Sequence, residues 1–342
     1  MQSQNQTRNR RISLAVCRCL TVLALLAIMA NCAPTSGKKP MNSFNEPTIT
    51  YGAGRFVVDI PAAMSFAGQY YLQGRAINEV VWPNDEDALS GWQKHLDEIS
   101  WLEPPQGMTG ALIEERDIPG IGIWCKAAFY FNEPLDPVYG AMDLLLNKST
   151  IGLWIKARDK KISAKETVYE ISTDIARAYR APRQRFGRSK VLNDRDAFYL
   201  RYGAVDLPFE YEESVDIVFK EHALDKTLVL SIETDVVGKV YWVGLMDRLA
   251  AMIAGNFVPG FKIEKIRTRT RMVAGLEGEE VIYRGIEKDG TRGLCFAWDY
   301  PGERIAPHAP NIVIDMLARD SHLEEKLALW DAVLDSLRPA GR

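Results

Sequence analysis

The most conspicuous chemistry in this chain belongs to two neighbouring carboxylates, Glu279 and Glu280, which follow arginines at the alternating positions Arg267, Arg269 and Arg271. The alternation predicts a strand, in which successive side chains point to opposite faces. Glu279 and Glu280 therefore cannot work together as an acid–base pair. The pattern indicates a cross-strand ladder of ion pairs or, alternatively, contact of these charges with a binding partner.

The other reactive side chains give no sign of a catalytic or metal site. The histidines lack a cysteine, histidine or carboxylate partner at metal-ligand spacing, and His95 is predicted on the polar face of a helix. The sequence has no GxSxG, HExxH or GxxxxGK[ST] motif and no GxGxxG after a strand. We therefore predict no catalytic residue, cofactor or metal, although a Ser-His-Asp set can assemble from distant positions. The four histidines are His95, His222, His308 and His322.

Residues 1–32 predict an export signal of the lipoprotein type. The apolar run 20–30 follows a basic head and is shorter than the roughly 20 residues that span a bilayer. Cys32 stands where a lipoprotein signal peptidase would cut, so its thiol is the predicted lipid attachment point. Export without lipidation and an uncleaved anchor are the alternatives. Residues 33–48, rich in polar residues and proline, predict a flexible tether.

The composition beyond the signal is that of an ordinary globular protein. The formal net charge of −3 and the lack of a basic block give no electrostatic footprint for nucleic acid. Cys125 and Cys295 lie in different halves of the chain, which predicts two buried thiols rather than a disulfide framework.

Two halves of the chain repeat the same features in the same order. Amphipathic helices predicted at 165–182 and 322–339 each follow a strand that ends in Ala-Arg-Asp, and each is expected to stop at a proline, Pro182 or Pro339. Earlier in each half, a strand leads into another amphipathic helix, at 87–99 and 240–253. These matches predict two similar domains, residues 49–182 and 183–342.

Hairpins are expected to connect the strands. Two strand-like segments, EVIYRGIE and TRGLCFAW, flank Lys288-Asp289-Gly290, and Asp-Gly is a strong signal for a tight turn. The predicted fold class is α+β, with two similar domains, each a mainly antiparallel sheet covered by helices. Trp101, Tyr139 and Tyr300 fall in irregular segments, and any of them exposed at the mouth between the halves would be an interface anchor.

The segment RTRTRMVAGLEGEEVIYRGIEKDG, followed by FAWDYPGE, resembles the C-terminal domain of the lipase-immunity proteins of the type VI secretion system. In that family, an arginine-bearing strand leads into a Gly-Leu-x-Gly-Glu-Glu turn, and a hairpin and a Phe-x-Trp-Glu element follow. Asp299 replaces the last glutamate, and GRFVVDIPAAMSF is similar to the family's opening strand. The matching residues are Arg271, Gly275, Leu276, Gly278, Glu279, Glu280, Arg284, Phe296 and Trp298.

The resemblance implies a periplasmic protein, often a lipoprotein, that binds a phospholipase effector of the fourth class delivered by neighbouring cells. Two lobes would grip the effector and block its active-site mouth, which requires no catalytic residue and no small-molecule substrate. The membrane would be reached only through the lipid anchor. The glycines of the motif are expected to serve the turn. An envelope lipoprotein that binds a ligand or acts as a scaffold is the alternative, and an enzyme is a third.

Overall fold

The computed structural model describes residues 46–181, 197–210, 212–240, 243–255 and 261–340. The described residues do not include the predicted signal 1–32 with Cys32, nor the predicted tether 33–48 up to residue 45. The last residue of the predicted tether, Thr48, begins β1 (Thr48–Ala53). Among the helices of the described residues, none combines the length and the apolar character that a membrane crossing needs.

The described residues form one 12-stranded sheet and two small three-stranded sheets, and every strand pairing in them is antiparallel. The large sheet has the order β14-β15-β16-β17-β13-β12-β3-β4-β8-β7-β6-β5. The predicted mainly antiparallel sheet with a few helices is thus confirmed.

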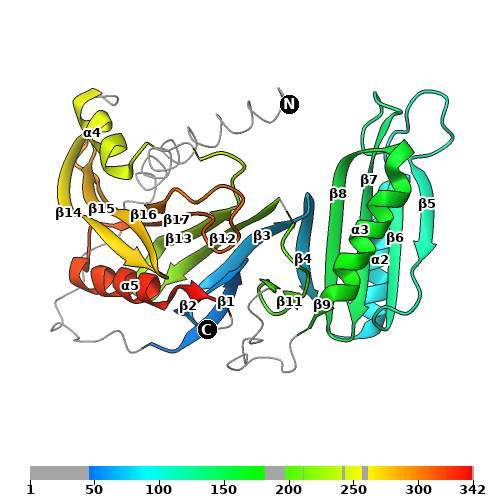
Figure 1. The fold of residues 1–342 in the computed structure, drawn as a ribbon, viewed down its shortest axis with the longest axis horizontal. Helices are drawn as coiled ribbons and strands as arrows, with labels where there is room; N and C mark the ends of the chain where they lie inside the picture. Colours follow the sequence, from blue (N-terminus) through cyan, green and yellow to red (C-terminus); the bar gives the residue numbers. More distant parts are fainter. Residues whose placement is uncertain (1–45, 182–196, 211, 241–242, 256–260, 341–342) are drawn as a thin grey trace.

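The same arrangement of elements occurs at both ends of this sheet (Figure 1). The N-terminal unit, residues 75–178, contains β4 (Arg75–Val81), α2 (Asp85–Ser100), β5 (Leu112–Asp117), β6 (Trp124–Tyr130), β7 (Tyr139–Lys148), β8 (Ile151–Lys161), the short η2 (Ile162–Ala164) and α3 (Lys165–Ala178). The C-terminal unit, residues 225–336, contains β13 (Asp225–Asp235), α4 (Leu245–Gly255), β14 (Lys262–Val273), β15 (Leu276–Ile286), β16 (Arg292–Tyr300), β17 (Asn311–Arg319) and α5 (Leu323–Ser336). Their strand orders, β5-β6-β7-β8-β4 and β14-β15-β16-β17-β13, correspond one to one.

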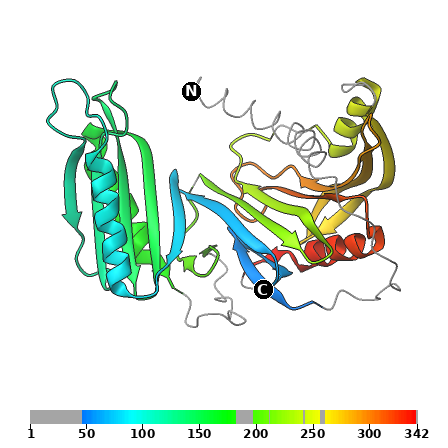
Figure 2. The same cartoon turned by 180° about the vertical axis from the view of Figure 1, so that it is seen from behind.

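The helices of each unit cover opposite faces of its sheet. In the N-terminal unit, Trp92 of α2 packs with Leu145 of β7, whereas Val168 of α3 lies in the core that contains Leu144, the preceding residue of the same strand. Neighbouring residues of a strand point to opposite faces, so β7 contributes to both cores. Figure 1 shows α3 in front of this sheet, and Figure 2, from behind, shows α2 in front.

Local signals explain where the helices begin and end. Asn84 caps α2, because its side-chain oxygen accepts a hydrogen bond from the amide of Asp87 at 2.9 Å. The helices predicted at 165–182 and 322–339 end earlier than expected, at Ala178 and Ser336. The next residues turn to extended backbone and form β9 (Tyr179–Arg180) and β18 (Arg338–Pro339), so strand pairing ends the helices before the prolines do.

Strands β3 (Ser65–Leu72) and β12 (Glu213–His222) join the two units in the middle of the sheet. The first strands, β1 to β3, with β2 at Phe56–Pro61, lie beside the C-terminal unit: β2 pairs with β18 and β3 with β12. Strand pairing therefore divides the chain differently from the predicted 49–182 and 183–342, because a pairing partner need not be close in sequence.

The connection between the units is narrow. β3 and β4 pair only over Tyr70↔Ile77, Tyr71↔Ala76 and Leu72↔Arg75. A second connection is the small sheet of β9, β10 (Phe198–Tyr199) and β11 (Ala204–Val205). Glu79 of β4 accepts hydrogen bonds from the Tyr179 hydroxyl at 2.6 Å and from the amides of Tyr202 and Gly203 at 2.7 Å each. This half-buried carboxylate therefore ties the N-terminal unit to the segment that leads to the C-terminal unit.

Candidate functional site

The glycines of the family motif are required by close packing and by turn geometry. Ala274 and Gly275 connect β14 to β15 with φ of 56° and 84°, a left-handed conformation that glycine adopts without strain. A Cβ added at Gly278 would lie 2.6 Å from the Trp298 ring and 2.7 Å from the Asp299 carbonyl oxygen. Both glycines therefore serve the scaffold, and Leu276 simply begins β15.

Glu280 lies at the centre of a buried ion network. Its carboxylate is fully buried and accepts hydrogen bonds from Arg267 at 2.9 Å, from Arg271 at 3.1 Å, and from Arg269. The indole N–H of Trp330 on α5 donates to it at 2.7 Å. The predicted ladder between Glu280 and the three arginines is thus confirmed. Because a buried charge is costly unless it is paired and hydrogen-bonded, all four donors stabilise this carboxylate.

The same arginines attach α5 to the sheet. Arg267 donates to both carboxylate oxygens of Asp331, at 3.0 and 2.7 Å, and Arg271 donates to Asp331 and Asp335. Burial alone would raise the pKa of Asp331, but the hydrogen bonds from Arg267 and Arg271 outweigh it and hold this pKa below its usual range. The network therefore connects β14, β15 and α5.

Glu279 serves the opposite face of the sheet, as the alternation of side chains requires. Its carboxylate accepts a hydrogen bond at 2.8 Å from the amide of Met246, in the first turn of α4. A carboxylate there caps a free amide and complements the positive end of the helix dipole. The adjacent glutamates thus hold one helix on each face of the sheet.

The remaining motif residues also act within the C-terminal unit. Arg284 pairs with Glu264 of β14 and Asp320 after β17, each at 2.8 Å. Phe296 and Trp298 are fully buried, and the Trp298 indole donates to the Arg271 carbonyl oxygen at 3.2 Å. Asp299, which replaces the family's glutamate, is buried and pairs with Arg248 of α4.

A histidine–aspartate pair in the N-terminal unit was not expected from the sequence. His95 lies against the rings of Trp92 and Trp154, with its Nε2 2.9 Å from buried Asp143, so its placement on a polar helix face was wrong. Asp143 also accepts hydrogen bonds from the Tyr130 hydroxyl at 3.0 Å and from Arg158. Burial would raise the pKa of Asp143, but His95 and Arg158 lower it overall.

The helix pattern could not reveal this pair, because Asp143 comes from β7. Among the interactions of His95 in the described part of the chain, none involves a serine or cysteine, so no nucleophile–base pair forms there.

Cys125 and Cys295 are buried in separate clusters, and neither belongs to a disulfide. Burial raises the pKa of the Cys125 thiol to about 12, which keeps it in its unreactive protonated form. Within the described ranges, no group of three or more potential ligands could hold a metal ion.

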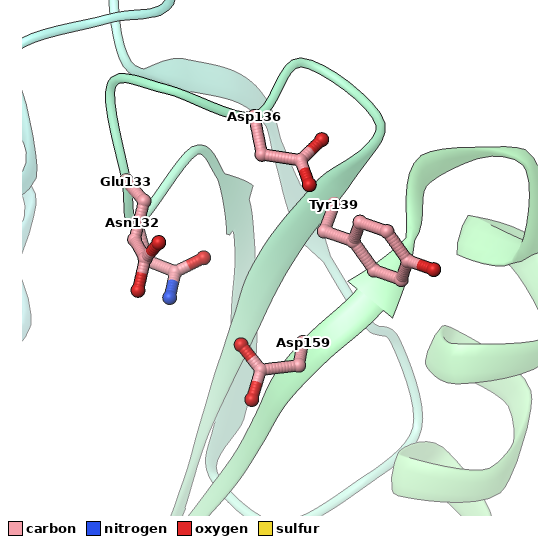
Figure 3. Close-up of a pocket in the computed structure, with 5 residues that line it drawn as sticks. All are labelled: Asn132, Glu133, Asp136, Tyr139 and Asp159. Carbon is pink, nitrogen blue, oxygen red and sulfur yellow. The ribbon is translucent and has the colours of Figure 1, made fainter. Parts of the chain in front are cut away.

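A hollow lies at one end of the N-terminal unit, beside the loop between β6 and β7 (Figure 3). It is lined by Asn132, Glu133, Asp136, Tyr139 and Asp159. Its three carboxylates give it a negative charge. The prediction of irregular segments was wrong for two of the three aromatic residues, since Tyr139 begins β7 and Tyr300 ends β16. Trp101 is 86% exposed and Tyr139 39% exposed, whereas Tyr300 is half-buried.

Comparison with known proteins places the C-terminal part of the chain in a family. Residues 200–340 match the family described as the Tle cognate immunity protein 4 C-terminal domain. The resemblance seen in the sequence to lipase-immunity proteins is thus confirmed for this part of the chain. A search of curated protein sequences gave no match.

Solved structures share the fold. The chain in "The crystal structure of Tle4-Tli4 complex" is 17% identical, with a TM-score of 0.68, and the match covers 86% of this chain and 98% of that one. The apo immunity protein TplEi of the type VI secretion system from Pseudomonas aeruginosa is 20% identical, with a TM-score of 0.66, over 86% of this chain and 97% of that one. TplEi complexed with "L" peptide is 19% identical, with a TM-score of 0.62, over 86% and 99%.

Proposed function

We propose that this protein is an immunity protein that binds and occludes a type VI secretion phospholipase effector, and so protects the cell from its own and its siblings' toxin. The observation that carries the proposal is the match of residues 200–340 to the Tle cognate immunity protein 4 C-terminal domain. The fold shared over 86% of the chain with a protein solved in a Tle4-Tli4 complex supports it.

Occlusion requires a rigid shape rather than reactive groups, and the conspicuous charges of this chain support that requirement. Glu279, Glu280 and Arg271 hold helices to the sheet, and the thiol of Cys125 is buried and protonated. The protein would therefore turn over no substrate of its own. Two similar domains, joined where β3 meets β4, would grip the effector from two sides.

The location follows from where such an effector acts. We place the protein in the periplasm, held to the membrane through a lipid on Cys32 after the signal 1–32 has been removed. Several acyl chains of a lipoprotein would anchor it firmly, whereas a single chain anchors only marginally. Labelling cells with a radioactive fatty acid tests this: label on the wild-type chain is expected to disappear in Cys32→Ala, and undiminished label would contradict lipidation.

The function is tested by purifying this protein together with the lipase encoded by the neighbouring gene. A complex of about one to one is expected, and the lipase should lose its activity on phospholipid vesicles as this protein is added. The protein alone should release no fatty acid. A lipase that binds nothing, or that retains full activity in the presence of excess protein, would contradict the proposal.

A further inference from the structure

Large apolar side chains gather at the end of the N-terminal unit where β5 begins, β6 ends and β7 begins. Strand register places them together, because Leu112 pairs with Tyr130 and Tyr139 with Lys161. Two loops meet there, residues 101–111 after α2 and residues 131–138 after β6, at the top of the right-hand unit in Figure 1. We call this end the apical surface; its exposed apolar residues are Trp101, Leu102, Met108, Leu112, Leu135, Val138 and Tyr139.

The exposure of this surface is unusual for side chains of this size. Leu135 is 91% exposed and Trp101 86% exposed, so both lie almost wholly in water. Single exposed apolar residues are ordinary, but several gathered on two adjacent loops mark an interaction surface. Tryptophan and tyrosine are also the residues that most often dominate binding energy.

The two loops are built to hold these side chains in place before binding. Pro104 and Pro105 follow Trp101 after two residues, and Leu135 lies between Pro134 and Pro137. Proline fixes its own φ and restricts the residue before it. Backbone hydrogen bonds from Phe131 to Ala111 and from Ile162 to Val138, each 2.9 Å, join the loops to their neighbours. Binding of a partner would therefore cost little conformational entropy in these two loops.

The charge around the apolar residues defines the partner. The same loops and strand end carry four carboxylates and only one exposed lysine, Lys161. The carboxylates are Glu103, Glu133, Asp136 and Asp159. An acidic rim favours a protein surface that presents lysine or arginine around an apolar centre. The same rim disfavours insertion of Trp101 into an anionic membrane, whose surface repels carboxylates.

In the C-terminal unit, the connection that corresponds to loop 131–138 lacks these features. There the β15–β16 connection is a tight turn closed by hydrogen bonds from Gly290 to Glu287 at 3.0 Å and from Glu287 to Thr291 at 2.9 Å. Lys288 and Asp289 form its tip, and it carries no large apolar side chain. Because the two units share one topology, the apolar loop 131–138 is an addition to the N-terminal unit and not a requirement of the fold.

We propose that the apical surface is a docking site for the effector, through a patch of that protein in which apolar residues are surrounded by lysine and arginine. This inference rests on the proposed function. It assigns the main contact energy to Trp101 and Leu135, and it assigns the speed and the salt dependence of association to Glu103 and Glu133.

The test measures the affinity of the purified full chain for the lipase encoded by the neighbouring gene. Trp101→Ala and Leu135→Ala are each expected to weaken binding by roughly 10- to 30-fold, mainly through faster dissociation. The matched control is Ile123→Ala, since Ile123 is 56% exposed but lies at the opposite end of the same sheet. All three variants should retain the wild-type unfolding midpoint, because each side chain is exposed.

The charge part of the inference has its own readout. Glu103→Lys combined with Glu133→Lys should slow association and reverse its dependence on salt, whereas Glu170→Lys, at an exposed position on α3, should not. If the association rate of the double variant depends on salt concentration as that of the wild-type chain does, the acidic rim is not a recognition element.

Three outcomes would overturn the inference. If the wild-type chain binds the lipase but Trp101→Ala and Leu135→Ala bind as tightly as Ile123→Ala, the surface is wrong and the proposed function stands. If the wild-type chain binds no lipase, the proposed function fails and this inference fails with it. Binding to phosphatidylglycerol vesicles, or a dimer in light scattering, that disappears in Trp101→Ala would assign the surface to lipid or to a second copy.

Discussion

Both units attach their last helix to their edge strand by ion pairs, but only the C-terminal unit centres these pairs on a fully buried carboxylate. In the N-terminal unit, Glu114 and Arg116 of β5 pair with Lys165 and Glu166 of α3, all at least partly exposed. In the C-terminal unit, the arginines of β14 pair with Asp331 of α5 and with Glu280, which is fully buried.

Burial, rather than position in the fold, is expected to set the energy of such a pair. Exposed ion pairs contribute only about 0–1 kcal/mol, since water and salt weaken them. Breaking a buried pair costs about 3–5 kcal/mol, because the remaining charges lose their partner in a poor solvent. The C-terminal unit should therefore depend on its network far more than the N-terminal unit does.

The largest effect is expected for Glu280→Ala. Three arginines and the Trp330 indole lose their common acceptor, so the free energy of unfolding should fall by about 3–5 kcal/mol. Guanidinium chloride unfolding measures this change. Glu279→Ala is the matched control: it removes only the cap of α4 and should cost about 1 kcal/mol. Equal losses in the two variants would show that burial does not set the difference.

Gly278→Ala should have the next largest effect. The new methyl group would meet the Trp298 ring and the Asp299 backbone, and overpacking of this kind costs about 1–3 kcal/mol. At Gly275, where a Cβ meets no atom within 4 Å but φ is 84°, alanine should cost only about 1 kcal/mol. Thermal unfolding of both variants compares overpacking at Gly278 with backbone strain at Gly275. A greater loss of stability in the Gly275 variant would contradict the packing argument.

Acid should weaken the attachment of α5. The pKa of Asp331 is lower in the folded protein than the unfolded value of about 3.9, so its contribution is complete above that value and is lost as the pH falls below it. Between pH 5 and pH 2.5, the stability of Asp331→Asn should therefore fall less than that of the wild-type chain. Denaturant unfolding at a series of pH values measures the stability of both chains. If the two stabilities fall equally with pH, the prediction is contradicted.

The smallest effect is expected for Glu114→Gln. Hydrogen bonds from Arg116 and Lys165 lower the pKa of Glu114 to about 2, yet the pair lies near water. The loss of unfolding free energy at neutral pH should therefore be below about 1 kcal/mol. A loss above 2 kcal/mol in guanidinium chloride unfolding would remove the proposed contrast between the units.

Residue patterns along single segments predicted much of what lies within each unit. Alternation along 267–280 predicted that one of the two adjacent glutamates would meet the arginines, because β14 and β15 are adjacent in sequence and form one hairpin. The register of that hairpin selects Glu280. The positions of α2, α3 and α5 followed from their apolar stripes. Their ends did not, because Tyr179 and Leu337 leave the helix to meet strands that are distant in sequence.

The candidate binding residues were only partly visible in the sequence. Trp101 and Tyr139 stood out as aromatic residues, although Tyr139 begins β7 rather than lying in the irregular segment that we predicted, whereas Leu135 did not stand out, because one leucine carries no signal of its own. His95 was placed on the wrong face, since its partner Asp143 belongs to another element.

The sequence by itself determined the order of the elements, the repeated arrangement of strands and helices, and an ion-pair ladder between one of the two adjacent glutamates and the arginines, because these depend on periodicity and on neighbours in one hairpin. Only the tertiary structure decided that β1 to β3 lie with the C-terminal unit, that Glu280 is buried under Trp330, and that two proline-bounded loops meet at the apical surface. These features depend on segments that are far apart in the chain, and local patterns carry no information about which distant surfaces come together.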